Sequence, residues 1–306
     1  MKHSSVFMVA ITLASCATAR AQTRAISLAY QVTHVDQASP AISPDGTRMV
    51  YAVAIEGKEQ LFIVNLDGSE SVQITHDSSN HDNPIWSPDG RKLVFASDKN
   101  GGEAIYIMDA RGGGEERLTD NQHQYIHPAW SADGTKVIYC SNDDVHPPQK
   151  NASEIYSIDL KSREIRTLIT GGTNTYPSWS LDGQKIVFRK IIGDMNSEVF
   201  VANSDGRDQR NLSNNVAFDG WPAWSPDGTQ IAFASNRDGN YKIFIMNADG
   251  ANVRLLADTE GRATEPRWSP DGKRVYFTNC YSVAWGTDCE VFAADAIRSE
   301  LNRPSQ

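Results

Sequence analysis

The sequence has few features of a hydrolase, a zinc protein or a nucleic-acid-binding protein. Its four cysteines form no Cys-x-x-Cys pair and no Cys/His spacing typical of a zinc site. A Gly-x-Ser-x-Gly segment, which carries the nucleophile of an α/β-hydrolase, is absent. Positive charge is scarce: the net charge is −9, and it becomes −11 without residues 1–21, because 27 basic side chains then face 38 acidic ones. This balance argues against nucleic-acid binding, and no polybasic segment suits a membrane surface.

Residues 1–21 have the features of a secretory signal peptide. Lys2 precedes a short apolar stretch over residues 6–14, which is too short to serve as a transmembrane anchor. Two processing routes fit. Residues 19–21 (Ala-Arg-Ala) suit simple cleavage after residue 21, whereas residues 13–16 (Leu-Ala-Ser-Cys) look like a bacterial lipobox that would leave Cys16 lipidated. We therefore predict a periplasmic or secreted protein and favour simple cleavage, with a lipoprotein as the alternative.

What the chain does contain is one short motif written six times, Pro-x-(Trp/Ile)-Ser-x-Asp-Gly. Successive copies lie 44, 44, 49, 45 and 44 residues apart. A fixed period of this length indicates an array of one supersecondary unit. The copies begin at Pro40, Pro84, Pro128, Pro177, Pro222 and Pro266.

Each period contains four short extended segments that alternate with turn residues. In the second period they are the Pro-x-Trp-Ser stretch, residues 92–96, residues 105–109 and residues 117–119. Such runs are rich in β-branched and aromatic residues and too short for helices. Four antiparallel strands per period make up a propeller blade. We predict an all-β, six-bladed propeller over residues 22–295, followed by a polar tail over residues 296–306.

The two ends of the chain predict how the ring closes. The sixth repeat stops after its third strand, near Glu290 to Asp295, and lacks a fourth. The segment Gln31 to His34 matches Gln73 to His76, which belongs to a fourth strand. We therefore expect residues 26–33 to complete the last blade and to leave no open sheet edge.

The tryptophans separate into two groups. Five of them, at positions 86, 130, 179, 224 and 268, occupy the same place in the motif, and Ile42 takes that place in the first repeat. We expect these side chains to pack between neighbouring blades. Trp221 and Trp285 lie outside this register, and we expect them to be exposed.

The cysteines predict one disulfide. Cys280 and Cys289 flank a single loop of the sixth repeat, so an oxidising compartment would join them. Cys140 follows Val137, Ile138 and Tyr139 in a strand and is expected to be a buried thiol.

The six Pro-x-Trp-Ser-Pro-Asp-Gly units, each followed by segments such as Ile-Tyr-Ile-Met-Asp and Leu-Thr, resemble the TolB-type, or PD40, β-propeller repeat. The resemblance covers residues 26–295 and excludes the N-terminal α/β domain that TolB carries. It does not extend to the Gly-His and Trp-Asp signature of WD40 repeats. Similar repeats occur in the propellers of prolyl oligopeptidases and of oligogalacturonate lyases. The resemblance implies the fold, while function has to come from the site.

Variable loops predict where a partner binds. The segments 142–153, 190–197 and 279–288 differ in length between repeats and fall on one face of the propeller. Residues just before each blade proline should surround the channel mouth on that face, and they are accompanied there by Asp82 and Trp285. We predict that Asn83, His127, Tyr176, Trp221, Glu265 and Trp285 bind a protein or peptide partner, or a glycan. The alternative is that these side chains simply fill the channel.

Two further functions compete with a non-enzymatic binding module. His81, Asp82 and His127 could form a metal site, as an oligogalacturonate-lyase-like enzyme would need. Channel carboxylates could instead hold Ca²⁺ together with carbonyl oxygens. The other rival is a secreted scaffold in which the propeller is a spacer. We expect no cofactor and, as the first hypothesis, a binding module at the cell envelope.

Overall fold

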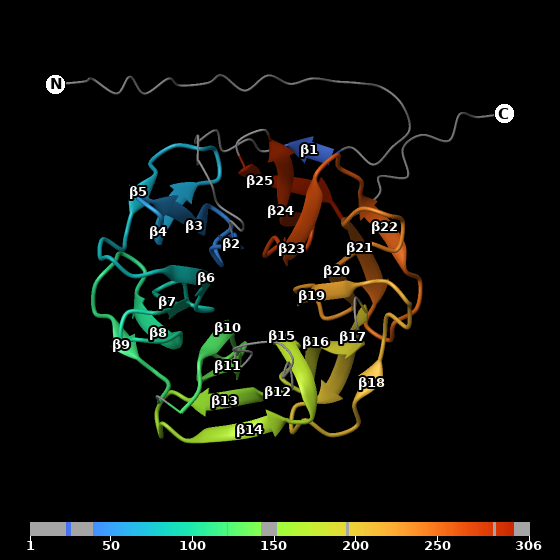
Figure 1. The fold of residues 1–306 in the computed structure, drawn as a ribbon, viewed down its shortest axis with the longest axis horizontal. Coiled ribbons are helices and arrows are strands. Elements are labelled where there is room, and N and C mark those ends of the chain that lie inside the picture. Colours follow the sequence, from blue (N-terminus) through green and yellow to red (C-terminus); the bar gives the residue numbers. More distant parts are fainter. Residues whose placement is uncertain are drawn as a thin grey trace.

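The fold is a ring of small β-sheets around one axis (Figure 1). The computed structural model describes residues 23–25, 39–120, 122–141, 152–193, 196–283 and 286–296. These residues form strands and turns in six sheets, which we call blades. The predicted six-bladed β-propeller is therefore confirmed. None of the described residues belongs to a helix with the length and hydropathy of a membrane span.

The first three blades follow one another along the chain, each numbered here from the axis outward. Blade 1 contains β2 (Ala41–Ile42), β3 (Arg48–Ile55), β4 (Lys58–Asn65) and β5 (Val72–Gln73). Blade 2 contains β6 (His81–Trp86), β7 (Lys92–Ser97), β8 (Ala104–Asp109) and β9 (Glu116–Arg117). Blade 3 contains β10 (Tyr125–Trp130), β11 (Lys136–Ser141), β13 (Ile155–Asp159) and β14 (Ile165–Ile169).

The last three blades add two irregularities. Blade 4 contains β15 (Gly172–Trp179), β16 (Lys185–Gly193), β17 (Asn196–Asn203) and β18 (Arg210–Asn211), with β12 (Ala152–Ser153) pairing in parallel beside β15. Blade 5 contains β19 (Asp219–Trp224), β20 (Gln230–Ser235), β21 (Lys242–Asn247) and β22 (Arg254–Ala257). Blade 6 contains β23 (Arg262–Trp268), β24 (Arg274–Val283), β25 (Gly286–Asp295) and, at its outer edge, β1 (Thr23–Ala25).

The N-terminal strand closes the ring, as predicted, but from a different segment. Thr23, Arg24 and Ala25 pair antiparallel with residues 292–294 of β25. The predicted segment, residues 26–33, lies outside the described residues. Closure by the N-terminus gives the outermost strand of blade 6 a partner and shortens its free edge.

The repeated motif forms the hairpin between the first two strands of each blade. In blade 2, Ser87 Oγ donates to Asp89 Oδ1 at 2.6 Å, and the backbone N–H of Arg91 donates to the same oxygen at 3.1 Å. Gly90 closes the turn with a φ of 69°, which a residue with a side chain adopts only with strain. Equivalent bonds recur in all six hairpins. The motif is thus a structural device for turning the chain.

The core lies between blades rather than within one of them. Buried side chains of blades 1 and 2, among them Leu61 and Phe95, belong to one apolar cluster together with Trp86. The indole N–H of Trp86 donates to the carbonyl oxygen of Ala41 in the preceding blade at 3.1 Å. Trp130 and Trp268 make the same bond across their own blade interfaces. The predicted packing role of these tryptophans is confirmed, since Trp179 and Trp224 also pack against apolar clusters that join two blades, although the indole N–H of Trp224 has no hydrogen-bond partner among the described residues.

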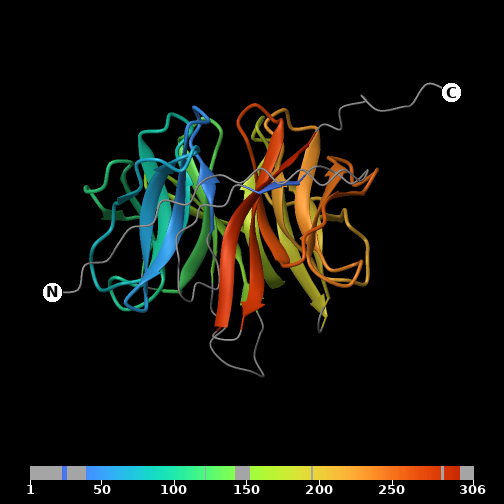
Figure 2. The same ribbon diagram turned by 90° about the horizontal axis from the view of Figure 1, so that it is seen from above.

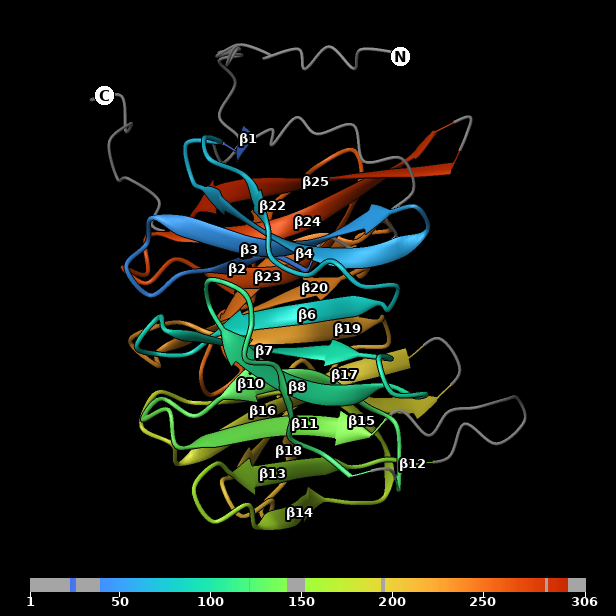
Figure 3. The same ribbon diagram turned by 90° about the vertical axis from the view of Figure 1, so that its left-hand side faces the viewer.

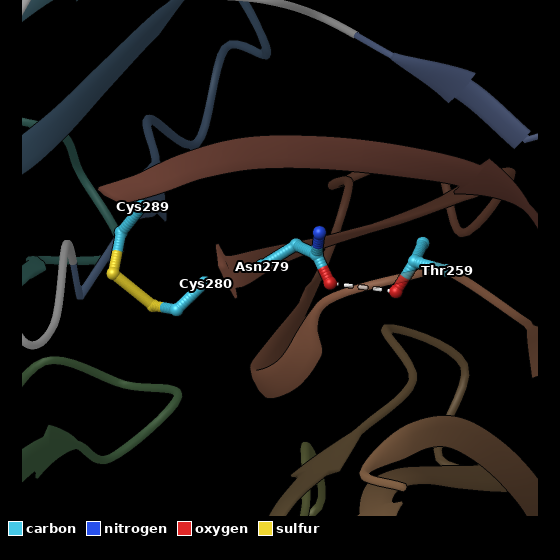
Figure 4. Close-up of a disulfide and its surroundings, with 4 residues drawn as sticks. All are labelled: Thr259, Asn279, Cys280 and Cys289. Atoms are coloured by element: carbon cyan, nitrogen blue, oxygen red, sulfur yellow. Dashed lines mark hydrogen bonds between the residues drawn. A yellow bond between two sulfur atoms is a disulfide. The ribbon is translucent and has the colours of Figure 1, made fainter. Parts of the chain in front are cut away.

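Two segments expected to be loops are instead extensions of strands. Residues 190–197 lie within β16 and β17 except for residues 194–195, and residues 279–288 continue β24 and β25 except for residues 284–285. Direct pairing of Cys280 with Cys289 in this antiparallel arm places their Cα atoms 4.0 Å apart, and the predicted disulfide joins them (Figure 4). Beside it, Thr259 Oγ1 donates to Asn279 Oδ1 at 2.6 Å. Cys140 is buried and free, as predicted.

The long arms project from one face of the ring. Figures 2 and 3 show the ends of β3 and β4, β16 and β17, and β24 and β25 on the same side of the molecule. The first residues of each inner strand lie on that side too, because His81, at the start of β6, pairs with Ser97 at the end of β7. We call this side the arm face and the opposite side, with the Ser-x-Asp-Gly turns, the hairpin face.

Candidate functional site

The residue before each blade proline has an unusual backbone conformation. All six of these residues have a positive φ, between 39° and 54°, although none is glycine. In five blades the strand register shifts at this residue and the proline after it, which is the mark of a β-bulge. Proline tolerates this place because it has no N–H to leave unpaired. We call these residues the axial ring: Ser39, Asn83, His127, Tyr176, Trp221 and Glu265.

Members of the axial ring contact one another across blade boundaries. Asn83 Nδ2 donates to Ser39 Oγ at 3.0 Å, which joins blades 2 and 1. The rings of His127 and Tyr176 stack with their centroids 3.6 Å apart, and those of Tyr176 and Trp221 lie 5.6 Å apart. The bulges therefore aim side chains from different blades at a common place. Strained positions of this kind are typical of functional sites.

The expectation that Trp221 is an exposed aromatic is wrong. Its side chain is 3% exposed and belongs to an apolar cluster with residues of blades 5 and 6. The rings of Phe218 and Tyr241 lie 5.0 and 6.0 Å from it. The sequence signal was misleading because a tryptophan outside one packing register can still enter another. The side chain of Trp285 lies outside the described residues.

One sector of the ring is acidic. Glu265 is 1% exposed, and neither of its carboxylate oxygens accepts a hydrogen bond of normal geometry from the described residues, although the Ser39 hydroxyl lies near enough to lower its pKa. Burial, together with the nearby Asp82 carboxylate, raises the pKa of Glu265 to about 7. Asp82 accepts a hydrogen bond from Asn83 Nδ2 at 2.8 Å through Oδ2, its Oδ1 has no hydrogen-bond partner in the described part of the chain, and burial raises its pKa as well. A second carboxylate close by disfavours the ionisation of Glu265.

The opposite sector is aromatic and basic. The guanidinium of Arg189 lies over the rings of Phe218 and Tyr176, 4.9 and 5.7 Å from their centroids, and its Nε has no partner. Gly220 permits this approach, because a Cβ there would lie 2.9 Å from Arg189 Cδ and 2.8 Å from the Phe218 ring. Burial lowers the pKa of Arg189. The site therefore holds cations and carboxylates that are not paired with each other.

Histidine 127 is neutral in this environment. Burial, together with the charges of Arg189 and Arg267, lowers the pKa of His127 well below its usual value of 6.5. Its Nδ1 lies 3.4 Å from Cys140 Sγ. Burial raises the pKa of that thiol to about 12, so it is not a nucleophile at neutral pH.

The suggested metal site of His81, Asp82 and His127 is not formed. His81 is fully buried, and its Nε2 lies 2.8 Å from Asp77 Oδ1, away from the axis. Residues that alternate along a strand point to opposite sides, so His81 and Asp82 diverge. No group of three His, Cys, Asp or Glu side chains among the described residues is placed to hold a metal ion. The hypothesis assumed that side chains of blades 2 and 3 meet at the axis, whereas the His81 side chain bonds to Asp77.

Some residues of the site were missed from sequence. Arg189, Phe218 and Tyr241 reach the ring from β16, from the residues before β19 and from the residues before β21. Arg262 and Arg267 come from β23, the strand of Glu265, and Arg262 lies 4.8 Å from the centre of the Tyr241 ring. Arg267 carried a signal, since it directly follows a blade proline where other repeats have Ala, Ile or Ser.

Comparison with known proteins supports the fold and the repeat. The TolB beta propeller domain family (PD40) matches residues 13–221 and 191–283. A TolB homolog from Chlorobium luteolum is 31% identical over 83 residues, which are 27% of this chain and 19% of that protein. The chain thus matches less than a fifth of this relative's length.

Solved structures extend the likeness to nearly the whole ring. A putative TolB from Agrobacterium tumefaciens has a TM-score of 0.68 at 25% identity, covering 85% of this chain and 90% of that one. TolB from Acinetobacter baumannii has a TM-score of 0.67 at 20% identity, covering 83% and 65%. An oligogalacturonate lyase from Vibrio parahaemolyticus has a TM-score of 0.60 at 14% identity, covering 89% and 93%, and shares the fold.

Proposed function

Because the chain belongs to the TolB β-propeller domain family, we propose that it is an exported, non-enzymatic module of the cell envelope that binds a protein or peptide over its axial ring. The observation that carries this proposal is the set of buried polar atoms around the axis that have no partner within the described residues. Native proteins rarely leave such atoms unpaired, so each calls for a partner or an ordered water. The atoms are Asp82 Oδ1, Thr175 Oγ1, Arg189 Nε, Trp221 Nε1 and both oxygens of Glu265.

The arm face also offers apolar contacts to a partner. Ile55 at the end of β3 and Ile192 near the end of β16 are 41% and 50% exposed, and Val216, before β19, is 91% exposed. Single exposed aliphatic residues are ordinary on protein surfaces. Here, however, they lie on the same face of the ring as the site with unpaired polar groups. A polar centre with an apolar periphery suits a folded or extended polypeptide better than a small sugar.

The proposal is tested by photocrosslinking in the native host. A photoreactive phenylalanine analogue is placed at Ile192 or Val216 on the arm face. The matched control carries it at Leu181, which is 59% exposed on the hairpin face. We expect a specific protein to be crosslinked from the arm face and not from Leu181. Equal crosslinking from both faces, or crosslinking from Leu181 alone, would contradict the proposal.

A lipid anchor and the export route stay predictions. The segment with Cys16 and the predicted cleavage site lies outside the described residues. Intact mass of the mature protein distinguishes the two routes, because acylation at Cys16 retains residues 17–21 and adds lipid.

A further inference from the structure

The acidic sector of the axial ring contains acceptors without donors. Three carboxylate oxygens, Asp82 Oδ1 and both oxygens of Glu265, accept no hydrogen bond of normal geometry from the residues that the structure describes, although Glu265 is 1% exposed. Asn83 Nδ2 donates to Asp82 Oδ2 at 2.8 Å, and hydrogen bonding by the Asn83 backbone and by Ser39 lowers the pKa of Asp82 without overcoming the effect of its burial. Buried carboxylates in proteins are normally paired, bonded or protonated.

A second buried glutamate in the same protein shows the ordinary arrangement. Glu198 is 2% exposed. Its carboxylate accepts from Ser213 Oγ and from the backbone N–H of Asn215, at 2.9 and 3.1 Å from its two oxygens. The fold is therefore able to satisfy a buried glutamate with its own donors. At Glu265 it does not.

The cations near this sector leave the acids unpaired. Arg262 and Arg267 stand on the same strand as Glu265 and draw its pKa down, but neither forms an ion pair with it or with Asp82 among the described residues. Arg267 donates to the carbonyl oxygen of Pro266 at 3.1 Å. From the other blades the axis is faced by Arg189, which rests on aromatic rings, by neutral His127 and by Tyr176, whose pKa is raised by burial.

We infer that Asp82 and Glu265 together form a receptor for a basic group of the docking partner, a primary ammonium or a guanidinium. This inference rests on the proposed function and names the chemistry that the partner brings to the axis. Such a group has several N–H donors and one positive charge, which match three free acceptor atoms on two acids. Below about pH 7 the free pair holds a proton, which is released when the basic group arrives.

A divalent metal ion fits the same atoms less well. Calcium takes six to eight oxygen ligands, and magnesium needs near-octahedral geometry. The described residues offer two carboxylates here and no cluster of three acidic, histidine or cysteine ligands. A basic group needs no such shell.

The inference is tested with small probes rather than with the unidentified partner. The probes are Nα-acetyl-lysine methylamide and Nα-acetyl-arginine methylamide, with the norleucine and citrulline analogues as neutral controls. Binding is followed through the NMR signal of the Trp221 indole N–H, assigned with Trp221→Phe. At pH 8 we expect the basic probes to bind at least tenfold more tightly than the neutral ones. At pH 5.5 this preference should fall at least tenfold, because the pair is then protonated.

Three variants locate the effect. Glu265→Gln and Asp82→Asn should each weaken the basic probes at least tenfold, while Glu198→Gln, compared per folded molecule, should leave them unchanged. Equal binding of basic and neutral probes by the parent protein, which needs no variant, would overturn the inference. So would saturable binding of Ca²⁺ or Mg²⁺ in place of the basic probes.

The two proposals fail separately. If the probes bind as expected but no protein is crosslinked from the arm face, the receptor for a basic group stands and the protein-binding role falls. If a protein is crosslinked there but the probes do not distinguish charge, the binding role stands and the receptor falls.

Discussion

Aspartate and glutamate behave in opposite ways on the two faces of this propeller. On the hairpin face, the carboxylate of each repeated aspartate accepts from a serine hydroxyl and from a backbone N–H, as Asp45 does at 2.5 and 3.0 Å. The serine bond, the largest cause, helps to lower the pKa of Asp45 to about 2. Around the axis, burial raises the pKa values of Asp82 and Glu265, the Asp82 carboxylate raises that of Glu265 further, and three of their oxygens lack a hydrogen-bond partner among the described residues.

The difference separates carboxylates that stabilise the fold from carboxylates that are available to a ligand. A carboxylate with local donors stabilises its turn, and its acceptor atoms are then occupied by hydrogen bonds within the turn. A buried, ionised carboxylate without donors lowers the stability of the fold. Such costly arrangements are typical of functional sites. Repetition alone does not make this distinction, since the hairpin aspartates are the most regular acids in the chain and take the structural role.

The largest effect should come from removing the aromatic wall of the site. Trp221→Ala deletes a nearly fully buried indole that packs against Phe218 and Tyr241, so we expect a loss of about 3–5 kcal/mol in the free energy of unfolding. Chemical denaturation measures it. Trp86→Ala, which opens a blade interface, is the matched control and should cost a similar amount. A loss under about 1 kcal/mol for Trp221→Ala would mean that the indole is not part of the core.

Replacement of the two buried glutamates, Glu198 and Glu265, by glutamine should have different effects on the free energy of unfolding. Glu198→Gln disturbs bonds from Ser213 and Asn215, and we expect it to cost about 1–3 kcal/mol. Glu265→Gln removes an unpaired charge, and at pH 8 its free energy of unfolding should equal or exceed that of the parent. Denaturation of both variants at pH 8 checks the pair. A loss of more than about 1 kcal/mol for Glu265→Gln would show that this carboxylate has a partner in the free protein.

The smallest effect should come from the hairpin face. Asp227→Ala removes bonds from Ser225 and Thr229 in an exposed turn, so the loss should be no more than about 1 kcal/mol. Because the pKa of Asp227 is lowered, its contribution is present above the usual aspartate value and is lost as the pH falls through the lowered one. Thermal unfolding should therefore show a larger difference between parent and variant at pH 7 than at pH 2.

Much of this contrast was accessible from the sequence, and part of it was not. The repeat predicted the blades, the hairpins and the six residues before the prolines, because local turn chemistry recurs with the period. The pairing of Cys280 with Cys289 also followed from local spacing. Local patterns of this kind survive folding unchanged.

The burial of Trp221 and the divergence of the His81 and Asp82 side chains could not be predicted from the sequence. They depend on which side of a strand a side chain takes and on what the next blade presents to it. Arg189 reaches the site from a second strand, and Gly220 makes room for it, a contact between residues 31 positions apart in the sequence. No period predicts such a meeting, since the pair joins β16 of blade 4 to β19 of blade 5.

The protonation of the acid pair is the most direct test of the contrast between the faces. Side-chain carboxyl ¹³C signals are followed by NMR from pH 3 to pH 9 in the parent and in Glu265→Gln. We expect one carboxyl signal of the parent to titrate near pH 7 and to be absent from the variant. The free energy of unfolding of the parent should fall between pH 4.5 and 7, because in this range the folded state holds a proton that the unfolded state releases. The hairpin aspartates should all titrate below the usual value of 3.8. Titration of every carboxyl below about pH 5 would contradict the account.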